Sequence, residues 1–301
     1  MSNRQIKKLL IANRGEIAVR IVRACAEMGI RSVAIYTEPD RYGLFVKRAD
    51  ESYSLGEDPL AGYLNPARIV NLAVETGCDA LHPGYGFLSE NPELARLCEE
   101  KNIAYVGPSS EVIHRMGDKT EARSAMTQAG VPVTPGSDGN LANIEEALVQ
   151  AERVGYPVMI KATSGGGGRG IRRCDDAEDL KSQYPRVISE ATKAFGSAEV
   201  FLEKCIINPK HIEVQVLGDS QGNVVHLYER DCSIQRRNQK LIEIAPSPQI
   251  SEEQRSYLGE MAVAAARYVG YESAGTVEFL LSGEDIYFME MNTRIQVEHT
   301  I

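Results

Sequence analysis

Carboxylate side chains concentrate near the C-terminal end of the chain, and two of them belong to a predicted β-hairpin. Two apolar runs, 277–281 and 286–291, flank a polar break, which predicts antiparallel strands joined by a three-residue loop, 283–285. This loop places Glu278 directly opposite Glu290, where like charges repel each other. We therefore expect a cation between them. Oxygen ligands of this kind suit Mg²⁺ or Mn²⁺ held together with substrate phosphates.

Polar residues continue to alternate with apolar ones beyond this hairpin. In an extended segment, side chains two residues apart share one face. The residues that would share it are Glu290, Asn292, Arg294, Gln296 and Glu298. A solvated strand face is the ordinary interpretation of such alternation, but the mixture of acids, amides and an arginine favours a functional surface.

The composition describes a globular enzyme of one large domain or two. The chain has 301 residues, of which 43% are hydrophobic and 25% charged. A net charge of −9 argues against nucleic acid as a general partner. No signal peptide or long apolar run indicates a membrane segment. The six cysteines lack zinc spacing, so we expect buried free thiols and a cytoplasmic location.

A basic segment stands out against this acidic background. Its cations are Arg230, Arg236, Arg237 and Lys240. Their density in a short stretch of an acidic chain predicts a pocket for small anions.

The N-terminal region predicts a doubly wound α/β domain. A short apolar strand, 7–12, is followed by a turn with Gly15, a helix that ends near Met28 and a second strand, 31–37. A dinucleotide site would need G-x-G-x-x-G at this turn, so the lone Gly15 argues against a dinucleotide oxidoreductase. The glycine-containing loop 83–91 is equally compatible with a ligand site and with a plain turn.

Two lysines and a glycine run in the middle of the chain indicate a phosphate site. Asp118 is a candidate N-cap for a helix, and Lys119 in its first turn would face an anion bound there. Lys161 interrupts an apolar strand, 156–162, and four glycines, 165–168, follow it. Free backbone N–H groups of such a loop can surround phosphate oxygens, although a flexible linker is the alternative. The order of residues matches neither a Walker A loop nor the protein-kinase arrangement.

Six runs of sequence together resemble the ATP-grasp superfamily, and within it biotin carboxylase. They cover residues 11–18, 82–91, 116–119, 165–170, 229–237 and 290–299. Residues 237–248 most resemble the separate biotin carboxylase subunit of two-subunit pyruvate carboxylases, with the biotin carboxylase of acetyl-CoA carboxylase close behind. The resemblance implies an α/β fold, α+β in its ATP-grasp part. We expect a Rossmann-like N-terminal domain at 1–115, a lid subdomain at 116–205 and an ATP-grasp core at 206–301.

The resemblance also implies a role for each matching position. The implied ATP-binding residues are Lys119, Lys161, Gly165, Gly166, Gly167, Gly168, Glu203, Lys204, Ile206, His211, Gln235 and Asn238. The implied metal ligands are Glu278, Glu290 and Asn292, as the hairpin argument also suggests. Bicarbonate would contact Lys240, Arg294, Gln296 and Val297. Glu298 would be the general base, with Arg294 and Lys240 beside it in catalysis.

The implied reaction has two steps. Glu298 deprotonates bicarbonate, which attacks the γ-phosphate of ATP to give carboxyphosphate and ADP. Carboxyphosphate then yields CO₂ and phosphate, the phosphate takes the proton of biotin N1′, and biotin is carboxylated. Phosphoryl transfer of this kind depends on positioning and charge neutralisation. Arg294 would lower the pKa of Glu298 and desolvation would raise it, and the sequence leaves that balance open.

Two features depart from the family pattern. Asn238 stands where many members have histidine, which affects the expected ribose contact. The sequence also stops at Ile301, where members continue for about another third. We therefore expect a truncated chain whose longer form is a homodimer that works with a biotin carboxyl carrier domain and a carboxyltransferase subunit. The alternatives are another ATP-grasp carboxylate ligase and an ATP-binding fragment without turnover.

Overall fold

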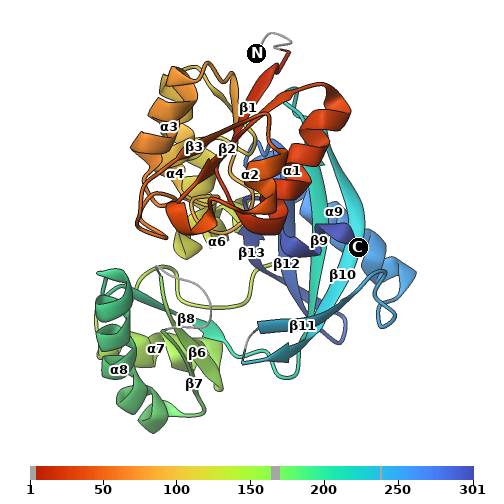
Figure 1. The fold of residues 1–301 in the computed structure, drawn as a ribbon. Coiled ribbons are helices and arrows are strands. Elements are labelled where there is room, and N and C mark those ends of the chain that lie inside the picture. The colour runs from red at the N-terminus through yellow and green to blue at the C-terminus, as the bar shows by residue number, and fades with distance from the viewer. Residues whose placement is uncertain (1–4, 164–169, 238) are drawn as a thin grey trace.

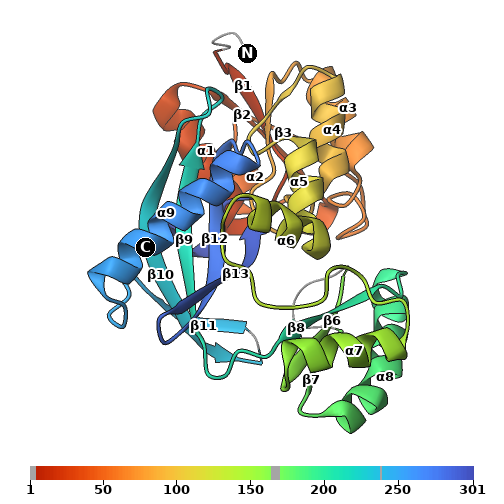
Figure 2. The same ribbon diagram turned by 180° about the vertical axis from the view of Figure 1, so that it is seen from behind.

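The computed structural model describes residues 5–163, 170–237 and 239–301. Three β-sheets with packed helices make up the described chain (Figures 1 and 2). The glycine run 165–168 and Asn238, both predicted to bind ATP, lie outside the described residues.

The N-terminal sheet is parallel and is covered by helices on both faces. In spatial order its strands are β3 (Glu51–Ser54), β2 (Arg31–Tyr36), β1 (Lys8–Ile11), β4 (Ala80–His82) and β5 (Ala104–Tyr105). Its helical elements are α1 (Gly15–Met28), η1 (Glu38–Asp40), α2 (Leu44–Arg48), α3 (Pro66–Glu75), α4 (Pro92–Glu100) and α5 (Ser110–Gly117). Leu9 and Ile11 pack with α1 and α2, whereas Leu10 packs with α3 and α4. This alternation confirms the predicted Rossmann-like arrangement.

A small antiparallel sheet forms a separate body with its own core. Its order is β7 (Ile171–Cys174), β6 (Val158–Ala162) and β8 (Val200–Lys204). Helices α7 (Ile144–Val154) and α8 (Ala177–Phe195) cover the face on which Val158 and Ile160 lie. Because side chains alternate along β6, Lys161 lies on the opposite face, which α7 and α8 do not cover.

The C-terminal sheet is antiparallel and contributes most of the predicted site. In spatial order its strands are β11 (Gln239–Ile244), β10 (Val224–Arg236), β9 (Lys210–Gly218), β12 (Ser273–Ser282) and β13 (Asp285–Asn292). Helices α6 (Lys119–Gln128) and α9 (Glu252–Tyr268) share a core with one face of this sheet. Asp118 caps α6 as predicted, since it accepts hydrogen bonds from the N–H groups of Thr120 and Glu121, both at 2.9 Å.

The β12–β13 hairpin differs from the predicted loop but keeps the predicted carboxylate pair. Ser282 pairs with Asp285, so the turn has two residues, 283–284, and not three. Glu278 nevertheless pairs with Glu290, because the register shifts by one residue at Met289. This β-bulge reverses the alternation of β13, so that Glu290 leaves the core face on which Phe288 is buried.

The predicted extended segment ends earlier than expected. Strand β13 stops at Asn292, and Glu298 lies in a short 3₁₀ helix, η2 (Val297–Thr300). The single-face alternation predicted as far as Glu298 is therefore wrong beyond Asn292. Tertiary contacts, and not strand periodicity, place the later residues.

Candidate active site

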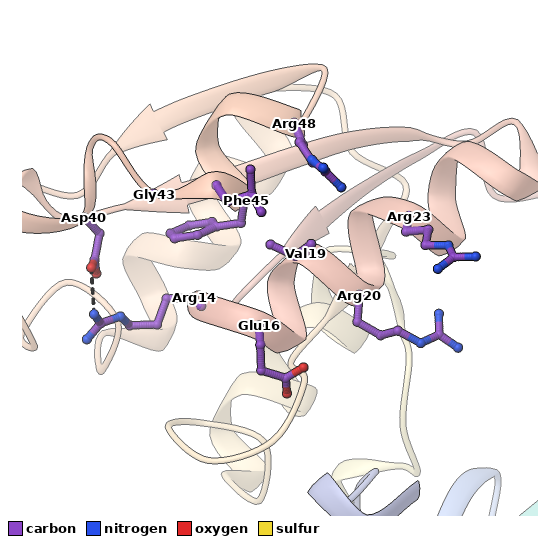
Figure 3. Close-up of a pocket in the computed structure, with 11 residues that line it drawn as sticks. Arg14, Glu16, Val19, Arg20, Arg23, Asp40, Gly43, Phe45 and Arg48 are labelled. Atoms are coloured by element: carbon purple, nitrogen blue, oxygen red, sulfur yellow. Dashed lines mark hydrogen bonds and ion pairs between the residues drawn. The ribbon is translucent and has the colours of Figure 1, made fainter. Parts of the chain in front are cut away.

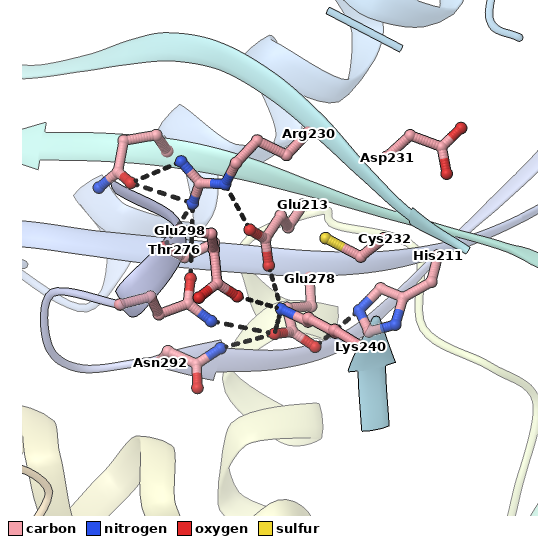
Figure 4. A network of polar contacts seen from close by, with 12 residues as sticks. His211, Glu213, Arg230, Asp231, Cys232, Lys240, Thr276, Glu278, Asn292 and Glu298 are labelled. Carbon is pink, nitrogen blue, oxygen red and sulfur yellow. Dashed lines mark hydrogen bonds and ion pairs between the residues drawn. The ribbon is translucent and has the colours of Figure 1, made fainter. Parts of the chain in front are cut away.

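A network of charged side chains centred on Lys240 covers the polar face of the C-terminal sheet (Figure 4). Lys240 Nζ lies 3.0 Å from Glu278 Oε1 and 2.9 Å from Glu298 Oε1. It also donates to Glu213 Oε2. Burial by itself would lower the pKa of Lys240, but the charges of Glu278 and Glu213 raise it above the ordinary lysine value. Lys240 is therefore a firmly charged cation that holds three carboxylates.

Arg230 is the second buried cation of this network. It donates from Nε to Glu213, which is fully buried, and from both Nη atoms to Gln215 Oε1 at 3.1 Å. Arg236 and Arg237 are exposed at the β10–β11 end. The structure thus brings Arg230 and Lys240 together on Glu213 and leaves Arg236 and Arg237 exposed.

Glu278 has the densest hydrogen bonding among the predicted metal ligands. Its Oε1 accepts from Asn292 Nδ2 at 2.8 Å as well as from Lys240, and its Oε2 lies 2.7 Å from His211 Nε2. Burial opposes ionisation, but His211 and Lys240 lower the pKa of Glu278 below its ordinary value. Glu278 is thus ionised at neutral pH.

Glu290 has a contrasting environment. Within the described residues no hydrogen bond or ion pair reaches its carboxylate. Burial and the charge of Glu278 raise the pKa of Glu290, and Lys119 only partly opposes them. Two adjacent carboxylates that lack a cation between them fit a hard divalent ion such as Mg²⁺. In the described ranges no three His, Cys, Asp or Glu side chains make a complete metal site, so oxygens of Asn292 or of a substrate would be needed as well.

Arg294 links this network to the N-terminal domain. Its Nη2 donates to Asn292 Oδ1 at 3.1 Å, and its Nε lies 3.1 Å from Glu90 Oε2, in the loop after β4. Gln296 is buried and spans Arg230 and Glu278 through longer contacts of 3.5 and 3.4 Å. Val297 is mostly exposed beside them.

The pKa of Glu298 is lowered, which answers the question that the sequence left open. Burial raises this pKa, but the hydrogen bond from Lys240 and the positive charge of Lys240 and Arg230 outweigh burial. Of the two cations expected beside Glu298, Lys240 donates to it, whereas the hydrogen bonds of Arg294 within the described residues go to Asn292 and the Ile295 carbonyl.

The predicted nucleotide residues form a second group on the small sheet and α6. Glu203 on β8 accepts a hydrogen bond from Lys161 on β6. Lys119, at the start of α6, is half-buried. Desolvation lowers its pKa, and its charged neighbours are Glu290, Lys161 and Glu203. Burial would raise the pKa of Glu203, but Lys161 and nearby cations bring it below the ordinary value. Lys119 thus connects the nucleotide group with the predicted metal ligands.

The remaining predicted nucleotide residues divide between the two groups. Lys204 donates to the carbonyl oxygens of Gly155 and Tyr156, at 2.8 and 2.9 Å. Ile206, two residues after Lys204, is half-buried. Gln235 Nε2 lies 2.7 Å from Nδ1 of His211, and through His211 both join the Lys240 network.

Sequence reasoning missed three residues that shape this site: Glu213, Glu90 and Arg123. Glu213 holds both Lys240 and Arg230. Its signal was present in the polar alternation of residues 211–215 on a half-buried strand. Glu90 lies in the loop 83–91, which the sequence left open between a ligand site and a plain turn. Arg123 carries no local signal, because its partner Glu203 is far away in the sequence.

A pocket of about 580 Å³ lies away from these residues, between α1 and α2 (Figure 3). Four arginines line it: Arg14, Arg20, Arg23 and Arg48. Arg14 is paired with Asp40 at 2.7 Å, on the same wall. None of the predicted site residues lines this pocket, so we assign the chemistry to the polar face of the C-terminal sheet.

Fold and site together define an ATP-grasp protein. The family model described as "Carbamoyl-phosphate synthase L chain, ATP binding domain" matches residues 118–301, and "Biotin carboxylase, N-terminal domain" matches residues 5–113. The chain belongs to the biotin carboxylase family.

Two curated relatives illustrate the similarity. The 2-oxoglutarate carboxylase small subunit of Hydrogenobacter thermophilus is 58% identical over 98% of this chain and 63% of its own length. The pyruvate carboxylase of Bacillus subtilis is 53% identical over 100% of this chain and 26% of its own length. The chain thus spans less than two thirds of each of these relatives.

Solved structures give the same result. The biotin carboxylase domain dimer of the Hydrogenobacter thermophilus 2-oxoglutarate carboxylase, in complex with MgADP, ADP and bicarbonate, has a TM-score of 0.95 at 57% identity, covering 99% of this chain and 66% of that one. The biotin carboxylase of Campylobacter jejuni has a TM-score of 0.95 at 50% identity, covering 98% and 67%. No helix in the described part of the chain is both long and apolar enough to cross a membrane.

Proposed function

We propose that this chain carries out the ATP-dependent carboxylation of biotin on a carrier protein, with bicarbonate as the carbon source. The observation that supports it best is the convergence of Lys240, Glu278 and Glu298 beside the unpaired Glu290. The related structure with MgADP and bicarbonate adds support, since it is 57% identical and covers 99% of this chain.

The network suggests how bicarbonate is handled. Arg294 and Lys240 supply two cations that can hold the anion, with Gln296 and Val297 beside them. Glu298 is ionised and accepts the proton of bicarbonate, so that the freed oxygen attacks the γ-phosphorus and ADP leaves. Lys240 must pass from Glu298 to the bound anion as Glu298 takes this proton, which keeps the buried charges paired.

The nucleotide group would bind ATP on the other side of the same site. Lys119 and Lys161 would neutralise the phosphates together with the loop 165–168, and Glu203, Lys204 and Ile206 would contact the adenine. His211, Gln235 and Asn238 would reach the ribose. Glu278, Glu290 and Asn292 would hold Mg²⁺ or Mn²⁺, which neutralises phosphate charge and orients the γ-phosphate.

The later step brings in biotin, which the carrier protein supplies. Carboxyphosphate breaks into CO₂ and phosphate, phosphate takes the biotin N1′ proton, and the biotin nitrogen attacks CO₂. The proposed partners are a biotin carboxyl carrier domain and a carboxyltransferase subunit, with a homodimer as the longer form. The three sheets support a division at 1–115, 116–205 and 206–301, although α6 packs in the core of the third sheet. The final carboxyl acceptor stays open, because relatives named for pyruvate and for 2-oxoglutarate both match.

The test is bicarbonate-dependent ADP release with Mg²⁺, measured with and without free biotin. Stimulation by biotin in the wild type, and its loss in Glu298→Gln, is the expected result. Glu284→Gln, an exposed carboxylate in the β12–β13 turn, is the matched control and should keep the wild-type rate. Nucleotide binding without biotin stimulation would contradict the proposal and favour an ATP-binding fragment without turnover.

A further inference from the structure

The linker between α6 and α7 pairs with both the C-terminal sheet and the small sheet within a few residues. Val133 forms a β-bridge with Phe288 of the C-terminal sheet. Gly136 forms a β-bridge with Glu203 of the small sheet. Only residues 134–135 lie between the two bridges. A change in the relative position of the two sheets would therefore act on this short segment, as well as on the β8–β9 connection at 205–209.

Arg123, on α6, contacts both the linker and the small sheet. Its Nη2 donates to the carbonyl oxygen of Thr134 at 2.7 Å, and its Nη1 donates to Glu203 Oε1 at 2.6 Å. The guanidinium also lies over the ring of Phe201, 5.9 Å from its centroid. Arg123 is anchored in turn by α6, whose residues Ala122 and Met126 are buried in the core of the C-terminal sheet.

The two oxygens of Glu203 are divided between two cations. Arg123 takes Oε1, and Lys161 takes Oε2. Glu203 is 8% exposed, so an unpaired charge there would be costly. With Arg123 in place, Glu203 keeps one cation when Lys161 turns toward another anion. Without Arg123, Lys161 would be its sole cationic hydrogen-bond partner within the described residues.

We propose that Arg123 is a positioning residue for the nucleotide site, which releases Lys161 for a nucleotide phosphate by holding Glu203 itself. The inference rests on the proposed function, because it takes Lys161 and Glu203 as nucleotide ligands. Arg123 touches no reacting atom and acts through Glu203 and the linker carbonyl.

The experiment compares MgATP and MgADP affinity, by calorimetry, in wild type and Arg123→Gln. A lost charge-assisted hydrogen bond predicts about tenfold weaker nucleotide binding. In turnover, KM for ATP should rise while KM for bicarbonate does not change. Arg153→Gln is the matched control: Arg153 donates to the Gly136 carbonyl of the same linker at 2.8 Å but does not contact Glu203. Its nucleotide affinity should stay within about twofold of wild type, since surface substitutions away from such contacts have small effects.

Further variants distinguish positioning from loss of folding. Arg123→Lys keeps a cation beside Glu203 without the guanidinium fork, so we expect a smaller loss, about threefold. If Arg123 acts through Glu203, the double variant R123Q/E203Q binds nucleotide no more weakly than E203Q alone. Additive losses in that cycle, or an R123Q affinity indistinguishable from that of the Arg153→Gln control, overturn the proposal.

The carboxylase proposal and the proposal for Arg123 can be tested separately. If wild type binds MgATP but biotin does not stimulate ADP release, the carboxylase proposal fails and the affinities still decide the role of Arg123. If wild type binds no nucleotide at all, both proposals are overturned.

Discussion

At the scale of single residues, the site is a set of carboxylates that compete for a few cations. Lys240 holds Glu213, Glu278 and Glu298 together, while Glu290 has no partner within the described residues. An arrangement that leaves one carboxylate unpaired beside another costs stability. A local loss of stability of this kind is typical of residues that bind a ligand.

Glu290→Gln should therefore change stability and binding in opposite directions. Without divalent cations, removal of the like-charge pair should stabilise the fold by about 0.5 kcal/mol. With Mg²⁺ and ATP, the variant should lose the metal-dependent part of nucleotide affinity. Urea unfolding and calorimetry measure the two effects, and Glu284→Gln in the exposed turn is the control. A variant that is less stable than wild type without metal would contradict this account.

His82 predicts how stability depends on pH. Burial lowers its pKa to about 4, and its Nδ1 accepts a hydrogen bond from the Gly84 N–H at 2.9 Å. As pH falls below about 6.5, the unfolded chain binds a proton that the folded chain refuses until about pH 4, so stability is lost in this window.

We expect His82 to account for a loss of about 1–2 kcal/mol in the free energy of unfolding between about pH 7 and about pH 5. His82→Asn keeps an acceptor for Gly84 but does not titrate, so its stability should fall less over the same interval. Urea unfolding of both proteins at the two pH values measures the difference. Equal losses would show that carboxylates alone cause the pH dependence.

At the scale of elements, the bulge in β13 decides which side chains reach the site. Before Met289, the even-numbered residues Ile286 and Phe288 are buried in the core. After it, Met291 is in the core and Glu290 joins Glu278 on the polar face. The extra residue at Met289 thus moves Glu290 from the apolar face of β13 to the polar face, where it lies opposite Glu278.

The two-residue turn of this hairpin depends on Gly283. Its φ is +61°, and a Cβ built there would meet nothing within 4 Å, so the cost of a side chain is purely conformational. Gly283→Ala should lower the free energy of unfolding by about 1 kcal/mol. Gly139→Ala, where there is equal space and no positive φ, should cost nothing. Thermal unfolding of both variants is the measurement, and an equal effect would contradict the conformational explanation.

At the scale of the whole molecule, three sheets contribute to one site. Glu90 in the N-terminal domain reaches Arg294, Lys119 lies between Glu290 and the small sheet, and Arg123 connects α6 with Glu203. A ligand that contacts all of these elements would stabilise them as a unit, because it binds only the folded arrangement.

MgATP should therefore raise the stability of the whole chain. At a free concentration of about 100 times its Kd, it should add about 2.7 kcal/mol to the free energy of unfolding. In wild type, chelation of Mg²⁺ should remove most of the stabilisation by ATP. In Glu290→Gln, whose stabilisation by ATP is already smaller, chelation should change it little. Thermal unfolding with and without chelator tests this. Full stabilisation by ATP in chelator would exclude a role for Glu278 and Glu290 as metal ligands.

The sequence by itself determined the family, the doubly wound N-terminal sheet, the Asp118 cap and the opposition of Glu278 and Glu290. These features depend on local periodicity, on hydrogen bonds over a few residues, or on runs of residue types that remain recognisable in isolation. The predicted hairpin loop was one residue too long, but the bulge at Met289 still places Glu278 opposite Glu290.

Only the tertiary structure decided which cation holds which carboxylate. Lys240 and Glu213 are 27 residues apart, and Arg123 and Glu203 are 80 apart. Neither separation leaves a signal in a local pattern, because the contact depends on how separate elements pack. For the same reason the sequence expected Arg294 to lower the pKa of Glu298, whereas in the packed sheet the lowering comes from Lys240.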